Sequence, residues 1–382
     1  MGKTLLCLVP SRLSDLEAKG VTGHITERDL GGYWERVYTV HPFCLSERRV
    51  ELSERHTVLE YRFGLRMLVS LARLIKREKI DAIKAHDPYC TGAIALALSF
   101  LCHIPYVIMI CSSYDLMYQT TGKSILVFRW LDSLVSAVTL RFAAMVFGGS
   151  EDAMRWAIKN GAKESTACVV RTGGVDAIHY AQTEPWSDIK ASKGLSGKRV
   201  ILYIGRLDPV KFPDDAVKCF AEVSKSEPGA VLVMAGEGDM RDEVEKLVSH
   251  LGLADKVRFL GFIPQRELYD WTHSADVIVA PLSGSALVES ALSGTAVVAY
   301  DIDWHSELIV NGETGILVKY RDCKAMAEAV LWLLADDGLR HELGMCARQR
   351  ALEQHGLENV YRTEASCFDR LSVGTKTKIV AK

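Results

Sequence analysis

The sequence lacks several patterns that mark other classes of protein. Its ten cysteines are scattered, with no C-x-x-C pair, which disfavours a disulfide framework or a zinc site and is typical of thiols in a reducing compartment. The formal net charge of -2 is not the basic excess of a nucleic-acid-binding protein. The first predicted strand leads into residues 10–14 (PSRLS) and not into G-x-G-x-x-G. A dehydrogenase is therefore disfavoured.

Long apolar runs are also missing. The longest candidate, residues 91–110, is broken by His103 and Pro105 into a helix and a short strand, whereas a membrane-spanning helix needs roughly 20 residues. The apolar part of residues 1–10 is too short for a secretory signal and predicts a buried strand. We expect a cytoplasmic protein, with contact at the inner face of a membrane left open.

What the chain does contain is a repeated alternation of strand-length apolar runs and helical patterns. With 382 residues, 48% hydrophobic and 25% charged, it can bury more than one core. Near-continuous apolar strands between helices predict parallel sheets covered on both faces. The predicted strands lie near residues 4–9, 36–40, 81–85, 106–110, 144–147 and 168–171, and then 199–204, 230–235, 257–260, 276–280, 295–300 and 315–318.

The two series of strands predict two α/β, Rossmann-like domains. A polar segment with glycines, residues 181–198, separates the series and predicts the linker. We therefore assign residues 1–180 to a first domain and 195–355 to a second. A helix over residues 356–373 has apolar residues at helical spacing, and we expect it to return to the first domain.

Two cations follow the first strand of the second domain. Arg206, in the turn Gly205-Arg206-Leu207, and Lys211 lie where ligands of open α/β sheets bind, at the carboxyl edge of the strands. Arginine offers a planar fork of donors and lysine a point charge, and together they suit a diphosphate. Glu289, predicted to open a helix, can accept hydrogen bonds from two ribose hydroxyls. This set predicts a nucleotide-sugar site.

The start of that helix also predicts anion binding. Ser285, Ala286 and Leu287 present backbone N–H groups that have no acceptor within the helix. In the first domain, Gly20 lies on the loop after the first strand and would let the backbone approach the diphosphate, although Gly23 competes for that role.

Five segments in order resemble the retaining glycosyltransferases of the GT-B fold whose second domain carries the "glycosyl transferases group 1" signature. The resemblance covers nearly the whole chain and is strongest over residues 200–318. Its motifs are G-R-L-D-P-V-K at 205–211, M-A-G-E-G at 234–238, L-G-F-I-P at 260–264, V-E-S-A-L-S-G-T at 288–295 and N-G-E-T-G-I-L-V at 311–318.

The resemblance implies two Rossmann-like domains facing a cleft and transfer of a sugar, with retention, from a nucleotide diphosphate sugar to an acceptor hydroxyl. It implies catalytic roles for His86, Arg206 and Lys211, and Phe262 in the loop at the nucleotide base. No metal or other cofactor is expected, because the two cations and a helix N-terminus neutralise the diphosphate. The expected partners are the donor and a sugar, glycolipid or small-molecule acceptor in glycan, polysaccharide or glycolipid synthesis; peripheral membrane contact stays open, and no nucleic acid is expected.

The sequence departs from the family pattern at two places. The family has a second glutamate eight residues before the ribose-binding one, where this chain has Pro281, so recognition of the donor sugar would rest on Ser283, Ser285 and backbone groups. Asp301 and Asp303 resemble a metal-binding D-x-D, but they lie where the family has a glycine-containing loop. Without the first glutamate, a catalytically weak or inactive nucleotide-sugar-binding partner subunit is the alternative function.

Overall fold

The chain forms two compact units, each with its own sheet. The computed structural model describes residues 3–14, 30–111, 126–171 and 188–379, and only the backbone of 126–132 and 372–379. One unit holds the described residues up to 171 together with the chain from Glu358 onward, and the other holds the chain from 188 to Leu357.

The first unit is built on an eight-stranded sheet in the order β3-β4-β2-β1-β5-β6-β7-β8. All pairs in it are parallel except the antiparallel pair β3–β4. Its strands are β1 (Thr4–Leu8), β2 (Arg36–His41), β3 (Arg48–Ser53), β4 (His56–Glu60), β5 (Ala82–Ala85), β6 (Tyr106–Ile110), β7 (Met145–Gly148) and β8 (Ala167–Val169). Its helices are α3 (Leu65–Arg77), α4 (Cys90–Cys102), α6 (Leu126–Phe142), α7 (Glu151–Lys159) and α17 (Leu357–Ile379).

The hairpin β3–β4 is missing from the sequence-based prediction. Strand β3 is mostly exposed and β4 carries His, Thr and Glu, so neither is an apolar run. Tertiary burial of β4 beside β2 fixes the strand despite this polar composition.

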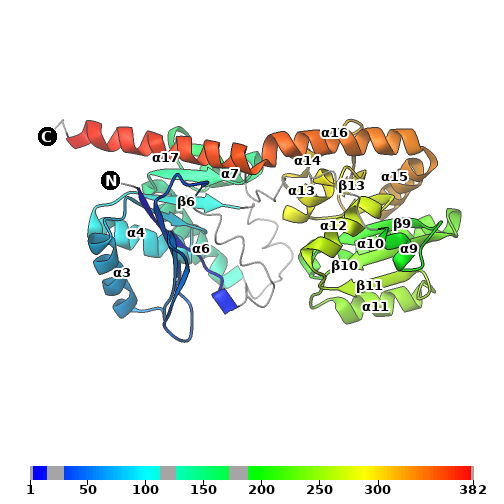
Figure 1. Cartoon of the computed structure of the whole chain (residues 1–382), viewed down its shortest axis with the longest axis horizontal. Helices are drawn as coiled ribbons and strands as arrows, with labels where there is room; N and C mark the ends of the chain where they lie inside the picture. The colour runs from blue at the N-terminus through cyan, green and yellow to red at the C-terminus, as the bar shows by residue number, and fades with distance from the viewer. Residues whose placement is uncertain (1–2, 15–29, 112–125, 172–187, 380–382) are drawn as a thin grey trace. The chain divides into compact units, whose positions relative to one another are not determined.

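Helices cover both faces of the first sheet. On one face, α3 and α4 bury Leu71, Ile75 and Leu98 in a shared core. On the other face, α17, the red helix in Figure 1, buries Val360, Cys367 and Phe368 against side chains of β1 and β7. The prediction that the C-terminal helix packs on the first domain is confirmed, and the helix continues to Ile379, beyond the expected residue 373.

The second unit has six parallel strands in the order β11-β10-β9-β12-β13-β14. They are β9 (Arg199–Ile204), β10 (Ala230–Ala235), β11 (Val257–Gly261), β12 (Val277–Ala280), β13 (Val297–Tyr300) and β14 (Ile316–Val318). Its helices are α9 (Ile189–Ser192), α10 (Pro213–Ser226), α11 (Arg241–His250), α12 (Gln265–Ser274), α13 (Ser285–Leu292), α14 (His305–Leu308), α15 (Cys323–Ala335) and α16 (Asp337–His355).

This strand order is that of a doubly wound Rossmann fold, in which the order reverses between the first and fourth strands. In the second unit the reversal falls between β9 and β12, which pair directly. In the first unit it falls between β1 and β5. The predicted pair of Rossmann-like domains is therefore confirmed, and each unit has one switch point where a ligand site is expected.

The predicted linker is wrong in its second half. Ile189 in α9 and the nearby Leu195 are buried in the core of the second unit, and Lys190 pairs with Asp276 at 2.6 Å. The glycines at 194 and 197 provide turns with positive φ inside the unit and not a hinge. Residues 181–187 lie outside the described part of the chain.

Candidate active site

The candidate site of the second unit lies at its switch point, where the loops that leave β9 and β12 are neighbours. Val279 on β12 pairs with Tyr203 on β9, so both strands deliver their loops to one edge. Arg206 and Lys211 come from the first loop, and Ser283 from the second. The structure thus brings together the cations and the helix start that the sequence predicted.

Two glycine turns interlock to shape the first loop. Gly205 donates its N–H to the Ala235 carbonyl at 3.1 Å, and Leu207 donates to the Glu237 carbonyl at 3.0 Å. Gly236 has φ 143°, and a Cβ there would lie 2.0 Å from the Gly205 carbonyl oxygen. Only glycine fits at that position, because the clash is with backbone that cannot move aside.

A buried tyrosine holds the same loop from below. The Tyr203 hydroxyl donates to the Arg206 carbonyl at 3.1 Å and lies 3.4 Å from that of Lys211, and the side chain is 1% exposed. Burial raises the pKa of Tyr203, so its hydroxyl remains a donor at neutral pH. The sequence analysis missed this residue, since it is one aromatic in an apolar strand.

The two cations have different surroundings. Arg206 is exposed and forms an ion pair with Asp208 at 2.6 Å. Lys211 is partly buried, and a Cβ on Gly284 would lie 4.0 Å from its Nζ. Burial, followed by the charge of Arg206, lowers the pKa of Lys211, while Asp303 and Asp208 oppose the shift. An anion bound here would relieve the unfavourable burial of the lysine charge.

The start of α13 completes this edge. Gly284 is the N-cap residue, and Leu287 donates back to its carbonyl at 3.0 Å, which leaves the amides of Ser285 and Ala286 at the open end of the helix. The positive end of the helix dipole therefore lies next to the Lys211 ammonium. An anion is the ligand that such a pair of features favours.

A fully buried histidine fixes the loop before α13. The Ser283 N–H donates to His305 Nε2 at 3.1 Å, and His305 Nδ1 lies 2.9 Å from the Tyr300 carbonyl. Burial lowers the pKa of His305 to about 4, so the ring is neutral and can accept through Nε2. His305 therefore positions this loop. Its contact with Ser283 could not be inferred from the spacing of the two residues in the sequence.

Glu289 corrects one expectation. It lies in the second turn of α13 and does not open the helix, because the helix already begins at Ser285. Burial raises the pKa of the Glu289 carboxyl, and Gln265 donates to its Oε1 at 3.1 Å, which opposes the rise. The carboxylate can accept further hydrogen bonds from a ligand hydroxyl. Phe262, which follows β11, is 62% exposed and offers an open aromatic face.

In the first unit, His86 follows β5 at the switch point, and its backbone N–H donates to the Leu8 carbonyl at 3.1 Å. Asp87 has a structural role, because its carboxylate accepts from the Tyr89 amide at 2.8 Å and from the Thr91 hydroxyl at 2.6 Å. Gly20 lies outside the described residues.

An apolar groove opens beside this loop. It has a volume of about 420 Å³ and is lined by side chains from the chain after β2 and β4 and from α3, α4 and α6. Phe43, Phe63, Tyr89 and Ile94 are among them. Such a lining accepts a hydrocarbon or another apolar group.

The described part of the chain contains no cluster suited to a metal ion, since no three or more of its His, Cys, Asp or Glu side chains are arranged to hold one. Among the same residues, no helix combines the length and apolarity needed to cross a bilayer.

Comparisons with known proteins match this chain to glycosyltransferases. Residues 186–350 match the family model described as glycosyl transferases group 1, and residues 28–186 match that of glycosyltransferase family 4. An uncharacterised glycosyltransferase of Methanocaldococcus jannaschii is 26% identical over 310 residues, which is 76% of this chain and 75% of that protein. Glycogen synthase of Mycobacterium tuberculosis is 29% identical over 204 residues, but the match spans only 47% of that protein and 52% of this chain.

Solved structures show the same fold. Sucrose-phosphate synthase from Thermosynechococcus elongatus superposes with a TM-score of 0.82 at 18% identity, over 97% of this chain and 100% of that one. HepE of Anabaena in complex with UDP-glucose superposes with a TM-score of 0.76 at 17% identity, over 97% of this chain and 99% of that one. The predicted GT-B fold class is confirmed by these likenesses.

Proposed function

We propose that this chain, which belongs to the group 1 glycosyltransferases, uses a nucleotide diphosphate sugar as donor and transfers its sugar with retention to an acceptor hydroxyl. The observation that carries the proposal is the approach of the Lys211 ammonium to the start of α13 at the β9–β12 switch point. A cation and a helix N-terminus at one edge of a Rossmann-like sheet suit a diphosphate. The related fold of HepE, solved with UDP-glucose, supports the choice of ligand class.

Each residue of the second unit has a proposed part in donor binding. Arg206 and Lys211 contact the diphosphate, and the amides of Ser285 and Ala286 face its distal phosphate, whereas the Leu287 amide is already bonded to the Gly284 carbonyl. Glu289 accepts hydrogen bonds from the ribose hydroxyls. Gly205 and Phe262 border the nucleotide, and Ser283 lies beside the sugar.

In the proposed reaction, the bond between the anomeric carbon and the diphosphate oxygen breaks while the acceptor oxygen bonds to the same face of the sugar. The acceptor proton passes to an oxygen of the leaving diphosphate. Negative charge grows on that diphosphate, and Lys211 and Arg206 stabilise it. His86 in the first unit is proposed to contact the donor sugar or its phosphate. No step needs a metal ion.

For the acceptor, we propose a sugar or glycolipid whose apolar part can occupy the groove beside α4. Exposed apolar side chains lie on α4 and α6, and Phe100 and Phe142 form an edge-to-face pair with centroids 6.1 Å apart. These side chains would rest against a membrane surface at the inner leaflet. An inactive nucleotide-sugar-binding subunit is the second candidate, because Pro281 replaces a sugar-binding glutamate.

A donor panel tests both candidates. Thermal unfolding is measured with UDP, GDP and ADP and with their sugars, since a ligand at 100 times its dissociation constant adds about 2.7 kcal/mol. Hydrolysis of the stabilising donor is then followed with and without EDTA. Stabilisation with hydrolysis supports the enzyme, and stabilisation without any turnover supports the binding subunit. No stabilisation by any nucleotide contradicts both, and loss of turnover in EDTA, restored by Mg²⁺, contradicts the metal-independent site.

A further inference from the structure

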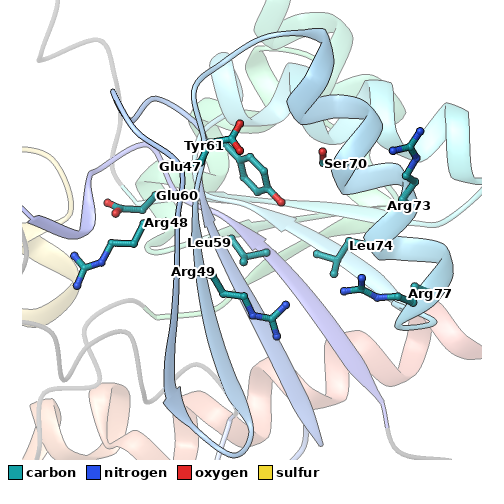
Figure 2. A pocket seen from close by; sticks show the side chains of 10 residues that line it. All are labelled: Glu47, Arg48, Arg49, Leu59, Glu60, Tyr61, Ser70, Arg73, Leu74 and Arg77. Carbon is teal, nitrogen blue, oxygen red and sulfur yellow. The ribbon is translucent and has the colours of Figure 1, made fainter.

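A second groove of the first unit is lined by arginines, and none of the candidate site residues lines it. It has a volume of about 430 Å³ and lies between the β3–β4 hairpin and α3. Figure 2 shows Leu59 of β4 and Leu74 of α3 between the arginine side chains, with Arg49 and Arg77 below them in the view and Arg73 above Leu74.

Strand alternation decides which hairpin residues face the groove. Arg49 pairs in register with Leu59, and Arg48 pairs with Glu60. Successive side chains of a strand point to opposite faces. In Figure 2, Arg48 and Glu60 are accordingly directed to the other side of the hairpin. Arg49 is therefore the arginine of β3 on the same face as Leu59, and Arg48 and Glu60 border the groove as well.

Carboxylates on the protein hold two of the arginines in place. Glu51 accepts from Arg49 Nε at 2.8 Å and Nη2 at 2.7 Å, and Glu78 accepts from Arg77 Nε at 2.8 Å. Hydrogen bonds from Thr57 and Arg49 lower the pKa of Glu51, so this carboxylate stays charged. Each guanidinium keeps further N–H donors that these contacts do not use.

The groove has further hydrogen-bond donors. Arg73 on α3 has no carboxylate partner among the residues that the structure describes. Tyr61 and Ser70 add two hydroxyls, and burial raises the pKa of Tyr61, which keeps its hydroxyl protonated. Glu47 and Glu60 are the acids among the lining residues. Arg73 is therefore the guanidinium of this groove whose charge no described carboxylate balances by an ion pair.

We propose that this groove binds a phosphate-bearing anion through Arg49, Arg73 and Arg77. Guanidinium groups match phosphate oxygens with paired, charge-assisted hydrogen bonds. Because two of the three are already oriented, less conformational entropy is lost on binding. Leu59 and Leu74 in the lining suit a ligand with an apolar part beside its phosphate. This site goes beyond the proposed glycosyl transfer, since β3, β4 and α3 supply none of the donor-binding residues.

The test measures the binding of inorganic phosphate to the full chain by calorimetry, in a Lys211→Ala background that silences the donor site. Arg73→Gln and Arg77→Gln are expected to weaken binding at least tenfold. Arg66→Gln, an exposed arginine of the same helix outside the groove, is the matched control and should stay within twofold. Since Arg73 forms no ion pair with any described residue, its replacement should leave thermal unfolding unchanged.

A second arm separates the sources of the phosphate. Vesicles of phosphatidylcholine alone are compared with vesicles that contain phosphatidylglycerol, in a co-sedimentation assay. If the chain binds only the anionic vesicles, and Arg73→Gln abolishes that binding, the ligand of the groove is a lipid headgroup. Phosphate binding without vesicle binding identifies a soluble phosphorylated ligand. Absence of both, or equal binding by Arg73→Gln, Arg77→Gln and Arg66→Gln, overturns the proposal.

Discussion

Lys84 on β5 donates a hydrogen bond to Glu364 on α17, and both charged side chains are almost buried, with 11% and 6% of their surface exposed. The pair joins the middle of the first sheet to a helix 280 residues later in the chain. It is a buried polar contact next to the apolar cluster that Val360, Cys367 and Phe368 of α17 form with the sheet.

We expect Lys84→Met to destabilise the protein by about 3–5 kcal/mol, because it leaves the Glu364 carboxylate buried without a partner. The double variant Lys84→Met/Glu364→Leu should recover most of that loss, since both charges are then absent. Urea unfolding measures the free energy of unfolding, and hydrogen exchange of the α17 amides shows whether the loss of stability is at this helix. Equal stability of the single variant and the parent would contradict this role.

Lys211→Ala is expected to lower kcat by about 10²–10³, because removal of one preorganised electrostatic donor costs about 2.7–4 kcal/mol in the transition state. Steady-state kinetics with the donor identified above provides the measurement. Lys225→Ala, which removes an exposed lysine of α10, is the control and should leave kcat unchanged. Parent-like turnover by Lys211→Ala would remove this residue from the proposed mechanism.

Glu289 should make donor binding sensitive to mild acid. Its carboxyl has a pKa raised above the usual 4.5 by burial, so it takes up a proton at a higher pH than an ordinary glutamate. A protonated carboxyl accepts ribose hydroxyls less well, and the donor KM should therefore rise as the pH falls. Glu289→Gln should show a raised KM that changes little with pH. If Glu289→Gln keeps the pH profile of the parent, the group that titrates is not Glu289.

His305 predicts a pH dependence of folding. Its pKa is about 4 in the folded chain and about 6.5 when unfolded, so the unfolded state binds more protons between these values. Stability should be complete above pH 6.5 and should fall by on the order of 3 kcal/mol as the pH approaches 4. His305→Gln should lack this part of the dependence. Unfolding free energies measured across that interval compare the two chains.

Gly236→Ala should impair both folding and donor binding. The new Cβ would meet the Gly205 carbonyl oxygen at 2.0 Å, so the Gly-Arg-Leu turn must shift. Gly229→Ala is the matched control, since a Cβ there meets nothing within 4 Å. We expect a lower melting temperature and weaker nucleotide binding for the first variant alone. Identical behaviour of the two variants would show that the interlocked turns are dispensable.

The sequence predicted the parts of the molecule that depend on local pattern. Buried parallel strands are apolar runs, so all six strands of the second unit were found, and Arg206 and Lys211 were placed at the strand edge because they follow such a run. The hairpin β3–β4 was missed, because burial against β2 and not composition makes β4 a strand.

Contacts between distant segments could not be predicted in the same way. His305 meets Ser283 across 22 residues, and its ring gives no sign in the sequence of which loop it supports. Glu289 was predicted to open the helix, but α13 already begins at Ser285, one turn earlier, with Gly284 as its N-cap residue. The arginine groove joins residues of a hairpin and a helix, and only the packed structure brings them to one surface.

The docking of α17 on the first sheet has a consequence for synthesis. Among the described residues the second unit is one continuous stretch, from 188 to Leu357, whereas the first needs the residues from Glu358 onward to cover one face of its sheet. A ribosome makes the chain from the N-terminus, so the second unit emerges complete while the first still exposes the surface that Phe368 will cover. The unit that is translated first is therefore the last to finish folding.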